Sequence, residues 1–227
     1  MGWEWRRVCA AQKFDAAGAV MTLLAACATG LAWFGNLGLA VLSVAAGALI
    51  VLLMIYRSEQ RAAFWTVAGA VAVGVFGISL ILIRQVGDDW SFALWFLVAV
   101  WATDIFAFFV GRAVGGPKLA PKISPGKTWS GLCGGIAGAL VWSVIWALWT
   151  GAGQAGTLAI LGAVIAVFAQ IGDLGVSRVK RRYGVKDTGT LIPGHGGLLD
   201  RVDGLVGAAP VALLCVGLTR GDMSLWT

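Results

Sequence analysis

Long apolar blocks, broken only by short polar segments, are the feature that most constrains this chain. They cover about residues 19–35, 37–56, 62–83, 92–111, 131–150, 156–173 and 204–219. Each block is close to the roughly 17 to 25 residues that a helix needs to cross a bilayer. The blocks lack the polar/apolar alternation of membrane barrels, and a tight turn near Gly35-Asn36 favours a helical hairpin between the first two. We therefore expect an all-α integral membrane protein. It should be a polytopic bundle of about seven transmembrane helices, forming a single membrane domain over residues 1–227.

Composition agrees with a membrane protein and excludes several other classes. Hydrophobic residues make up 59% of the chain and charged residues only 12%, about half the charged fraction of a typical soluble domain. The net charge of +6 is assigned to loops that face anionic lipid and the cytoplasm, so no nucleic-acid partner is expected. The four cysteines form no CxxC pair and are read as reduced core thiols. The N-terminus shows neither a cleavable signal peptide nor a myristoylation signal.

Lysine and arginine positions predict the orientation. Fifteen of the 17 Lys and Arg residues fall in alternate polar segments, beginning with the N-terminal one. Cytoplasmic loops carry such an excess of basic residues, so we expect the N-terminus to be cytoplasmic. The two longest polar segments, residues 112–130 and 174–203, then both face the cytoplasm, and any chemistry on a soluble nucleotide should take place there.

The second of these loops combines acidic, basic and glycine residues. Its carboxylates, with the one that ends the sixth span, are Asp173, Asp187, Asp200 and Asp203. Carboxylates at this density repel each other unless a cation neutralises them, and their hard oxygens suit Mg²⁺. The neighbouring Lys and Arg side chains suit phosphates, which indicates phosphoryl or nucleotidyl transfer at a lipid surface. The alternative is an ordinary basic loop with internal salt bridges, which would leave the glycine-rich residues 193–197 without a purpose.

Local patterns predict how this loop folds. The sixth helix should continue through Ser177 into the cytoplasm, and Gly184 is a plausible stop. Backbone can approach a ligand closely at the glycines around His195. Asp200 and Asp203 are three residues apart, so they would share one face of a helix.

Residues Ser177 to Asp203 read S-x-V-K-R, four residues, K-D-x-G, and then P-x-H-G-G-L-x-D-R-V-D. This segment resembles the signature of the phosphatidate cytidylyltransferases, or CDP-diacylglycerol synthases. Residues Thr103 to Gly131 and the N-terminal WEWRRV are similar to further family segments. The resemblance implies transfer of the cytidylyl group of CTP to phosphatidate from the inner leaflet, giving CDP-diacylglycerol and pyrophosphate. It implies Mg²⁺, with K⁺ as a second cation, and a multi-pass protein of the cell inner (cytoplasmic) membrane with its active site facing the cytoplasm.

The chain departs from the family pattern in two respects. Family members commonly have additional N-terminal spans. The family's second conserved stretch usually ends with an acidic residue where this chain has Ser130, which puts the contribution of that carboxylate in question.

The residues and the resemblance together assign the candidate site. The catalytic residues are Asp173, Asp187, Asp200, Asp203, Lys180, Arg181 and His195. The residues that bind the phosphates of CTP and phosphatidate are Lys118, Lys122, Ser124, Lys127, Thr128, Ser177, Lys186, Arg201, Gly196 and Gly197. The metal ligands are Asp104, Asp173, Asp187, Asp200 and Asp203.

Several of these assignments have an alternative. Asp104 lies roughly 12 Å inside the fourth span, where a charge costs about 2.5 to 3.5 kcal/mol, so it either completes the metal site or pairs with a basic neighbour. The lysines of residues 118–128 could instead meet lipid headgroups. His195 is either a general acid/base or a residue that positions a phosphate or holds the loop. Gly131, Gly134, Gly135 and Gly138 predict close helix packing, within the chain or across a homodimer.

Two other functions compete with the cytidylyltransferase reading. A CDP-alcohol phosphatidyltransferase opens its motif with D-G-x-x-A-R, which residues 173–178 match only in outline, and the PGHGG turn is foreign to it. A cation-coupled transporter would explain Asp104. It would leave the cytoplasmic loop unexplained, and the sequence shows no pair of broken helices in repeated halves.

Overall fold

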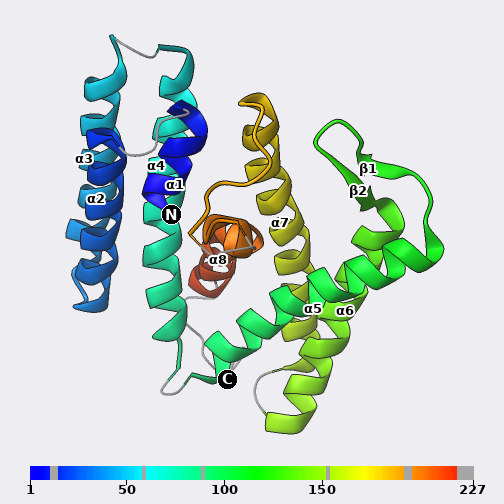
Figure 1. Cartoon of the computed structure of the whole chain (residues 1–227). Coiled ribbons are helices and arrows are strands. Elements are labelled where there is room, and N and C mark those ends of the chain that lie inside the picture. Colours follow the sequence, from blue (N-terminus) through cyan, green and yellow to red (C-terminus); the bar gives the residue numbers. More distant parts are fainter. Residues whose placement is uncertain (11–14, 58–59, 88–89, 152–153, 192–195, 219–227) are drawn as a thin grey trace. The chain divides into compact units, whose positions relative to one another are not determined.

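The computed structural model describes residues 1–10, 15–57, 60–87, 90–151, 154–191 and 196–218. Its contacts divide the chain into two compact units. Unit 1 comprises Met1–Leu82 and Val176–Asp203, and unit 2 comprises Ile83–Gly175 and the chain from Gly204 on. The element order is shown in Figure 1.

The predicted spans are confirmed. Seven helices of the described chain are long and apolar enough to cross a membrane. They are α2 (Ala16–Trp33), α3 (Leu37–Ile55), α4 (Gln60–Arg84), α5 (Ser91–Val114), α6 (Trp129–Thr150), α7 (Ala155–Arg182) and α8 (Leu199–Leu218). The protein is therefore a polytopic all-α membrane protein. The predicted extension of the sixth span is also present, because α7 runs to Arg182 and Gly184 follows with a φ of +69°.

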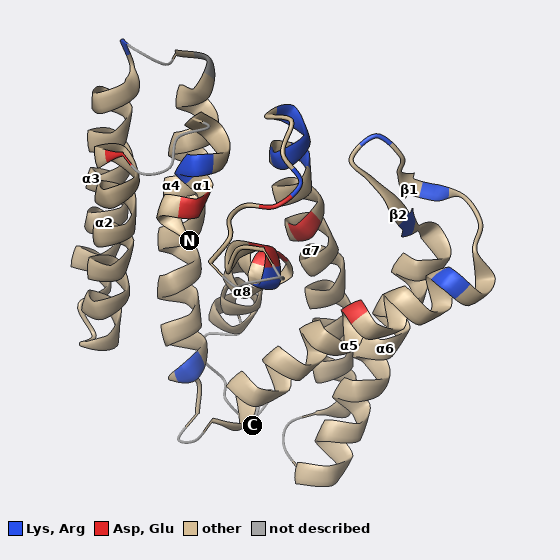
Figure 2. Ribbon diagram, in the orientation of Figure 1, with Lys and Arg blue, Asp and Glu red and all other residues tan. Residues whose placement is uncertain are grey.

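Three elements were not predicted. A short helix, α1 (Gly2–Ala10), precedes the first span. Between α5 and α6, a two-stranded antiparallel hairpin of β1 (Lys118–Ala120) and β2 (Ser124–Thr128) replaces the expected loop. Figure 2 shows blue Lys and Arg residues on this hairpin and on the last turns of α7, whereas the helices are mostly tan.

In unit 1, α2 and α3 form the predicted helical hairpin (Figure 1). Gly35 has a φ of +79° in the turn between them, a conformation that side chains rarely adopt. Asp15 caps α2, since its Oδ1 accepts a hydrogen bond of 2.8 Å from the Gly18 N–H. The small buried side chains of Ala28, Ala32 and Ala40 let α2 and α3 approach each other.

In unit 2, α5 packs along α6 through the glycines that the sequence singled out. Ideal Cβ atoms on Gly131, Gly134, Gly135 and Gly138 would all meet atoms of α5. The small residues of this helix therefore serve packing within the chain. The buried Trp95 adds to this contact, since its indole N–H donates to Ser143 Oγ over 3.2 Å.

Gly135→Ala is expected to destabilise the α5–α6 pair. Its Cβ would lie 2.8 Å from the backbone oxygen of Thr103, which cannot move without shifting α5. Such overpacking costs about 1 to 3 kcal/mol. Gly30→Ala is the matched control, because nothing lies within 4 Å of its Cβ position in α2. Thermal unfolding in detergent should give a lower midpoint for Gly135→Ala alone, and equal midpoints for the two variants would contradict this packing.

Candidate functional site

A nearly buried ion pair joins two parts of the predicted loop in unit 1. Lys180 lies near the end of α7 and Asp200 in the first turn of α8. Lys180 Nζ is 2.8 Å from Asp200 Oδ1, and the two side chains are only 11% and 10% exposed. Removing one partner of such a pair leaves an uncompensated charge out of water, so the pair is a fixed part of the unit.

The second oxygen of Asp200 closes the loop between α7 and α8. Asp200 Oδ2 accepts hydrogen bonds from the Thr188 N–H (2.8 Å), the Thr188 hydroxyl (3.0 Å) and the Gly197 N–H (3.0 Å). With Lys180, these bonds fill about four acceptor sites, the full capacity of an ionised carboxylate. In this arrangement Asp200 organises the loop. We call Lys180, Thr188, Gly197 and Asp200 the loop cluster.

The loop cluster requires glycine at two of the predicted positions. Gly196 has a φ of +83°, and a Cβ on Gly197 would lie 2.3 Å from Thr188 Oγ1. A side chain at Gly197 would therefore push Thr188 away from Asp200. The glycines of the signature thus allow close approach of backbone to side chains of the chain itself.

Glu4 is a functional candidate that sequence reasoning missed. Its carboxylate is fully buried and accepts hydrogen bonds from the N–H groups of Leu198 (2.7 Å) and Leu199 (3.1 Å) at the start of α8. The available signal was an acidic residue between Trp3 and Trp5 in a segment similar to the family.

The other predicted residues of unit 1 lie around this cluster. Ser177 and Asp203 are half-buried. The exposed residues are Arg181, Lys186, Asp187 and Arg201. His195 lies outside the described residues.

A second polar cluster lies within unit 2. Lys127 Nζ, from β2, is 2.5 Å from Asp173 Oδ2 and 2.8 Å from Gln170 Oε1, both on α7. Gln170 Nε2 in turn donates to Asp104 Oδ1 over 3.3 Å. We call Asp104, Lys127, Gln170 and Asp173 the span cluster. It brings together three residues that the sequence predicted.

Gln170 was missed, although it links the other members of the span cluster. Its side chain is buried, and both ends of its amide are used. A lone amide within an apolar span was the available signal, because polar groups at that depth need partners. The partner of Asp104 is this amide, and its carboxylate also interacts electrostatically with Lys127 and Asp173.

The donor atoms of the span cluster fit a hard cation. Asp104 and Asp173 supply carboxylate oxygens and Gln170 an amide oxygen, the ligand types that Mg²⁺ takes. The ammonium group of Lys127 lies against two of these three residues, so the cluster already accommodates a positive charge.

The carboxylates expected to gather around one metal are divided between the two units, with Asp173 in unit 2 and Asp187, Asp200 and Asp203 in unit 1. Within the described part of the chain, no three His, Cys, Asp or Glu side chains lie close enough together to hold a metal ion. Asp200 and Asp173 are each paired with a lysine. The metal-ligand assignments therefore stay predictions.

The hairpin of unit 2 holds the remaining predicted phosphate ligands. Lys118 and Lys122 are exposed, and Ser124 is half-buried. Thr128 is buried and caps α6, since its Oγ1 accepts from the Gly131 N–H over 3.0 Å. Its hydroxyl also contacts the Ser130 hydroxyl, which donates to the carbonyl of Gly115. Thr128 and Ser130 thus fix the junction between hairpin and helix.

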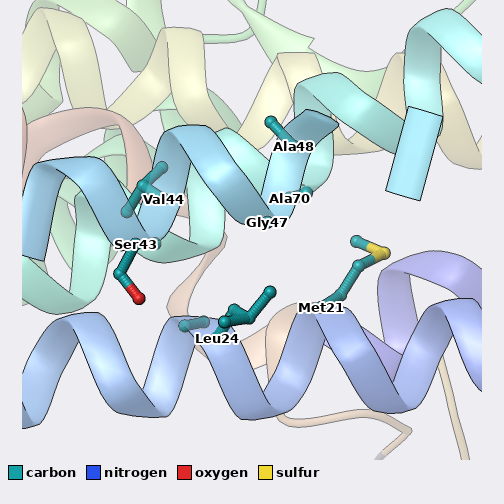
Figure 3. A pocket seen from close by; sticks show the side chains of 9 residues that line it. Met21, Leu24, Ser43, Val44, Gly47, Ala48 and Ala70 are labelled. Atoms are coloured by element: carbon teal, nitrogen blue, oxygen red, sulfur yellow. The ribbon is translucent and has the colours of Figure 1, made fainter. Parts of the chain in front are cut away.

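Unit 1 also has a pocket whose lining is mostly apolar, unlike the polar side chains of the two clusters. It lies between α2, α3 and α4, and Figure 3 shows Met21, Leu24 and Val44 among its lining side chains. None of its lining residues is titratable, and Ser43 supplies a hydroxyl. The pocket's lining offers no charged group that could bind a phosphate or a metal ion.

Seven apolar helices, with charged side chains confined to a few segments, define a polytopic membrane protein. Comparison with known families makes this more specific. The chain belongs to the cytidylyltransferase family, whose model matches residues 1–219.

The chain is similar to several proteins named phosphatidate cytidylyltransferase. It is 41% identical over 172 residues to that of Brucella abortus, which covers 74% of this chain and 62% of the relative. The Pseudomonas aeruginosa protein is 46% identical over 138 residues (58% and 49%), and the Haemophilus influenzae protein 47% over 122 residues (52% and 42%). The chain thus spans less than two thirds of the length of these relatives. The predicted family is confirmed.

Proposed function

We propose that this chain transfers the cytidylyl group of CTP to phosphatidate, giving CDP-diacylglycerol and pyrophosphate. The loop cluster is the observation that carries the proposal. Lys180, Gly197 and Asp200 are fixed positions of the signature, and they form one hydrogen-bonded group although they come from two helices and a loop. A short motif that matched by chance would have no reason to assemble in this way.

In the proposed reaction a phosphatidate oxygen attacks the α-phosphorus of CTP. The new P–O bond forms in line with the bond to the bridging oxygen, which breaks as pyrophosphate leaves. A phosphate oxygen is already ionised at neutral pH, so no strong base is required. The chain's contribution is to orient two anionic substrates and to offset their repulsion with basic side chains. Lys118, Lys122 and Lys186 are exposed and suited to that role.

Mg²⁺, with K⁺ as a second cation, is the proposed cofactor. Asp104, Asp173 and Gln170 would hold Mg²⁺ through their oxygens. The metal would supply charge neutralisation on the triphosphate. Asp187, Asp200 and Asp203 remain candidate ligands from the sequence.

The proposed orientation puts the N-terminus and both long polar segments in the cytoplasm. CTP would then enter from the cytoplasm, and phosphatidate from the inner leaflet of the bacterial inner membrane. The distribution of basic residues supports this proposal, because fifteen of the 17 fall in alternate polar segments.

Labelled CTP distinguishes the proposed function from its competitors. Purified full-length chain should incorporate label into lipid only when phosphatidate is present, with one pyrophosphate released per lipid product. Consumption of CDP-diacylglycerol with an alcohol acceptor would indicate a phosphatidyltransferase instead. Cation flux in liposomes without nucleotide turnover would indicate a transporter.

A further inference from the structure

We propose that Glu4 is a positioning residue that holds Gly189 and residues 197–199 in place before substrate binds. The functional part of this inference rests on the proposed function. The structural part rests on unit 1 alone. There α1 holds Glu4 against Leu198 and Leu199, which lie 194 and 195 residues further along the chain.

Glu4, from α1, lies directly against two glycines of the loop between α7 and α8. A Cβ on Gly197 would lie 2.7 Å from Glu4 Oε1, and one on Gly189 would lie 3.1 Å from the same oxygen. Gly189 and Gly197 therefore both lie against Glu4. The Met1 amino group lies 3.4 Å from Glu4 Oε2 and is a further neighbour.

Helix α1 cannot shift easily, so it holds Glu4 in place. The Trp5 indole N–H donates to the Trp65 carbonyl over 2.7 Å, and a Cβ on Gly69 would lie within 2.2 Å of the Trp5 ring. Arg6 Nε is 2.7 Å from Asp15 Oδ2, in the cap of α2. These contacts tie α1 to α4 and α2.

The backbone N–H groups that donate to Glu4 are of the kind that could otherwise bind a phosphate. The first N–H groups of a helix carry partial positive charge and commonly bind anions. At α8 the Leu198 and Leu199 N–H groups donate to Glu4, and those of Thr188 and Gly197 donate to Asp200. Two carboxylates of the chain thus occupy these donors. These four N–H groups are therefore already taken before substrate binds.

Hydrogen exchange on the full-length protein in detergent tests this role. Glu4→Gln keeps the size of the side chain but replaces one acceptor oxygen by a donor. We expect the amides of residues 197–199 to exchange at least about tenfold faster, since a hydrogen bond to a charged group contributes roughly 1.5 to 3 kcal/mol. Gly30→Ala is the control, because nothing lies within 4 Å of its Cβ position in α2. It should leave exchange at residues 197–199 unchanged.

Gly189→Ala gives an independent check without changing Glu4, because its Cβ crowds Glu4 Oε1. It should accelerate exchange at the same amides. Unchanged exchange in Glu4→Gln, or the same increase in Gly30→Ala, would overturn the inference.

Kinetics add a separate readout if the wild-type protein transfers cytidylyl groups. Glu4→Gln should then raise KM for CTP about tenfold, with a smaller change in kcat. A wild-type protein without transferase activity would refute the proposed function, while the exchange result would still decide the role of Glu4.

Discussion

Asp200→Ala is expected to lower cytidylyl transfer at least about a thousandfold while the protein still inserts in the membrane. The variant loses the three hydrogen bonds by which Asp200 joins Thr188 and Gly197 to α8. It also leaves Lys180, which is 11% exposed, without its carboxylate partner. Breaking a buried pair in this way costs about 3 to 5 kcal/mol, and catalysis that relies on exact placement suffers more than helix insertion. Labelled-CTP turnover, normalised to the protein extracted from membranes, gives the effect.

A double variant separates the effect of Asp200 on stability from its effect on catalysis. Combining Asp200→Asn with Lys180→Met removes both charges, so the double variant should unfold at a higher temperature than Asp200→Ala. It should remain inactive, because two charged groups of the signature are gone. Asp203→Ala, one helical turn further on, is also expected to be inactive. Near-normal turnover in both Asp200→Ala and Asp203→Ala would remove the proposed site.

The sequence was sufficient to predict the membrane helices because their signal is local and strong. An apolar block of about twenty residues can only be buried in lipid or in a protein core, and each of the seven blocks forms its helix. Helix α1 escaped prediction because its Glu and Arg residues read as a polar N-terminal segment. Its burial depends on Trp5 and Glu4, whose partners lie far along the chain.

The candidate site was predicted as a set of residues but not as an arrangement. Glycine spacing and the family resemblance identified the loop. Gly184 and Gly196 adopt positive φ angles, and Gly197 allows the close approach of Thr188. Charge density alone suggested that the acids share a metal. The structure pairs Asp200 with Lys180 and Asp173 with Lys127, a choice that depends on tertiary distances.

The hairpin shows a further limit of local patterns. Its strands include Pro125 and Gly126, residues that seldom form strands, so nothing in the sequence favoured pairing. The pairing nevertheless places Lys127 against α7. An unpredicted element thus completes the span cluster.

Asp104→Asn and Asp173→Asn are each expected to raise the Mg²⁺ concentration for half-maximal activity at least about tenfold, the effect of losing roughly 1.4 kcal/mol of binding. Each change replaces a carboxylate by a neutral amide, which is a weaker ligand for a hard cation. Asp173→Asn should have the larger effect on stability, since Lys127, at 19% exposed, loses its carboxylate partner. Gln170→Leu should also raise the Mg²⁺ requirement, because it removes the amide that joins Lys127 to Asp104.

Titration of Mg²⁺ at saturating CTP and phosphatidate measures this shift. Asp187→Asn is the informative comparison, because Asp187 is an exposed carboxylate of unit 1 that the sequence also predicts as a ligand. If the span cluster holds the metal, Asp187→Asn keeps the Mg²⁺ requirement of the wild type. A shift in Asp187→Asn together with wild-type behaviour of Asp104→Asn and Asp173→Asn would assign the metal to the loop of unit 1 instead. Lys127→Met tests the role of charge. Without the ammonium group, Asp104 and Asp173 have no competing positive charge beside them, so this variant should bind Mg²⁺ more tightly even if its turnover falls.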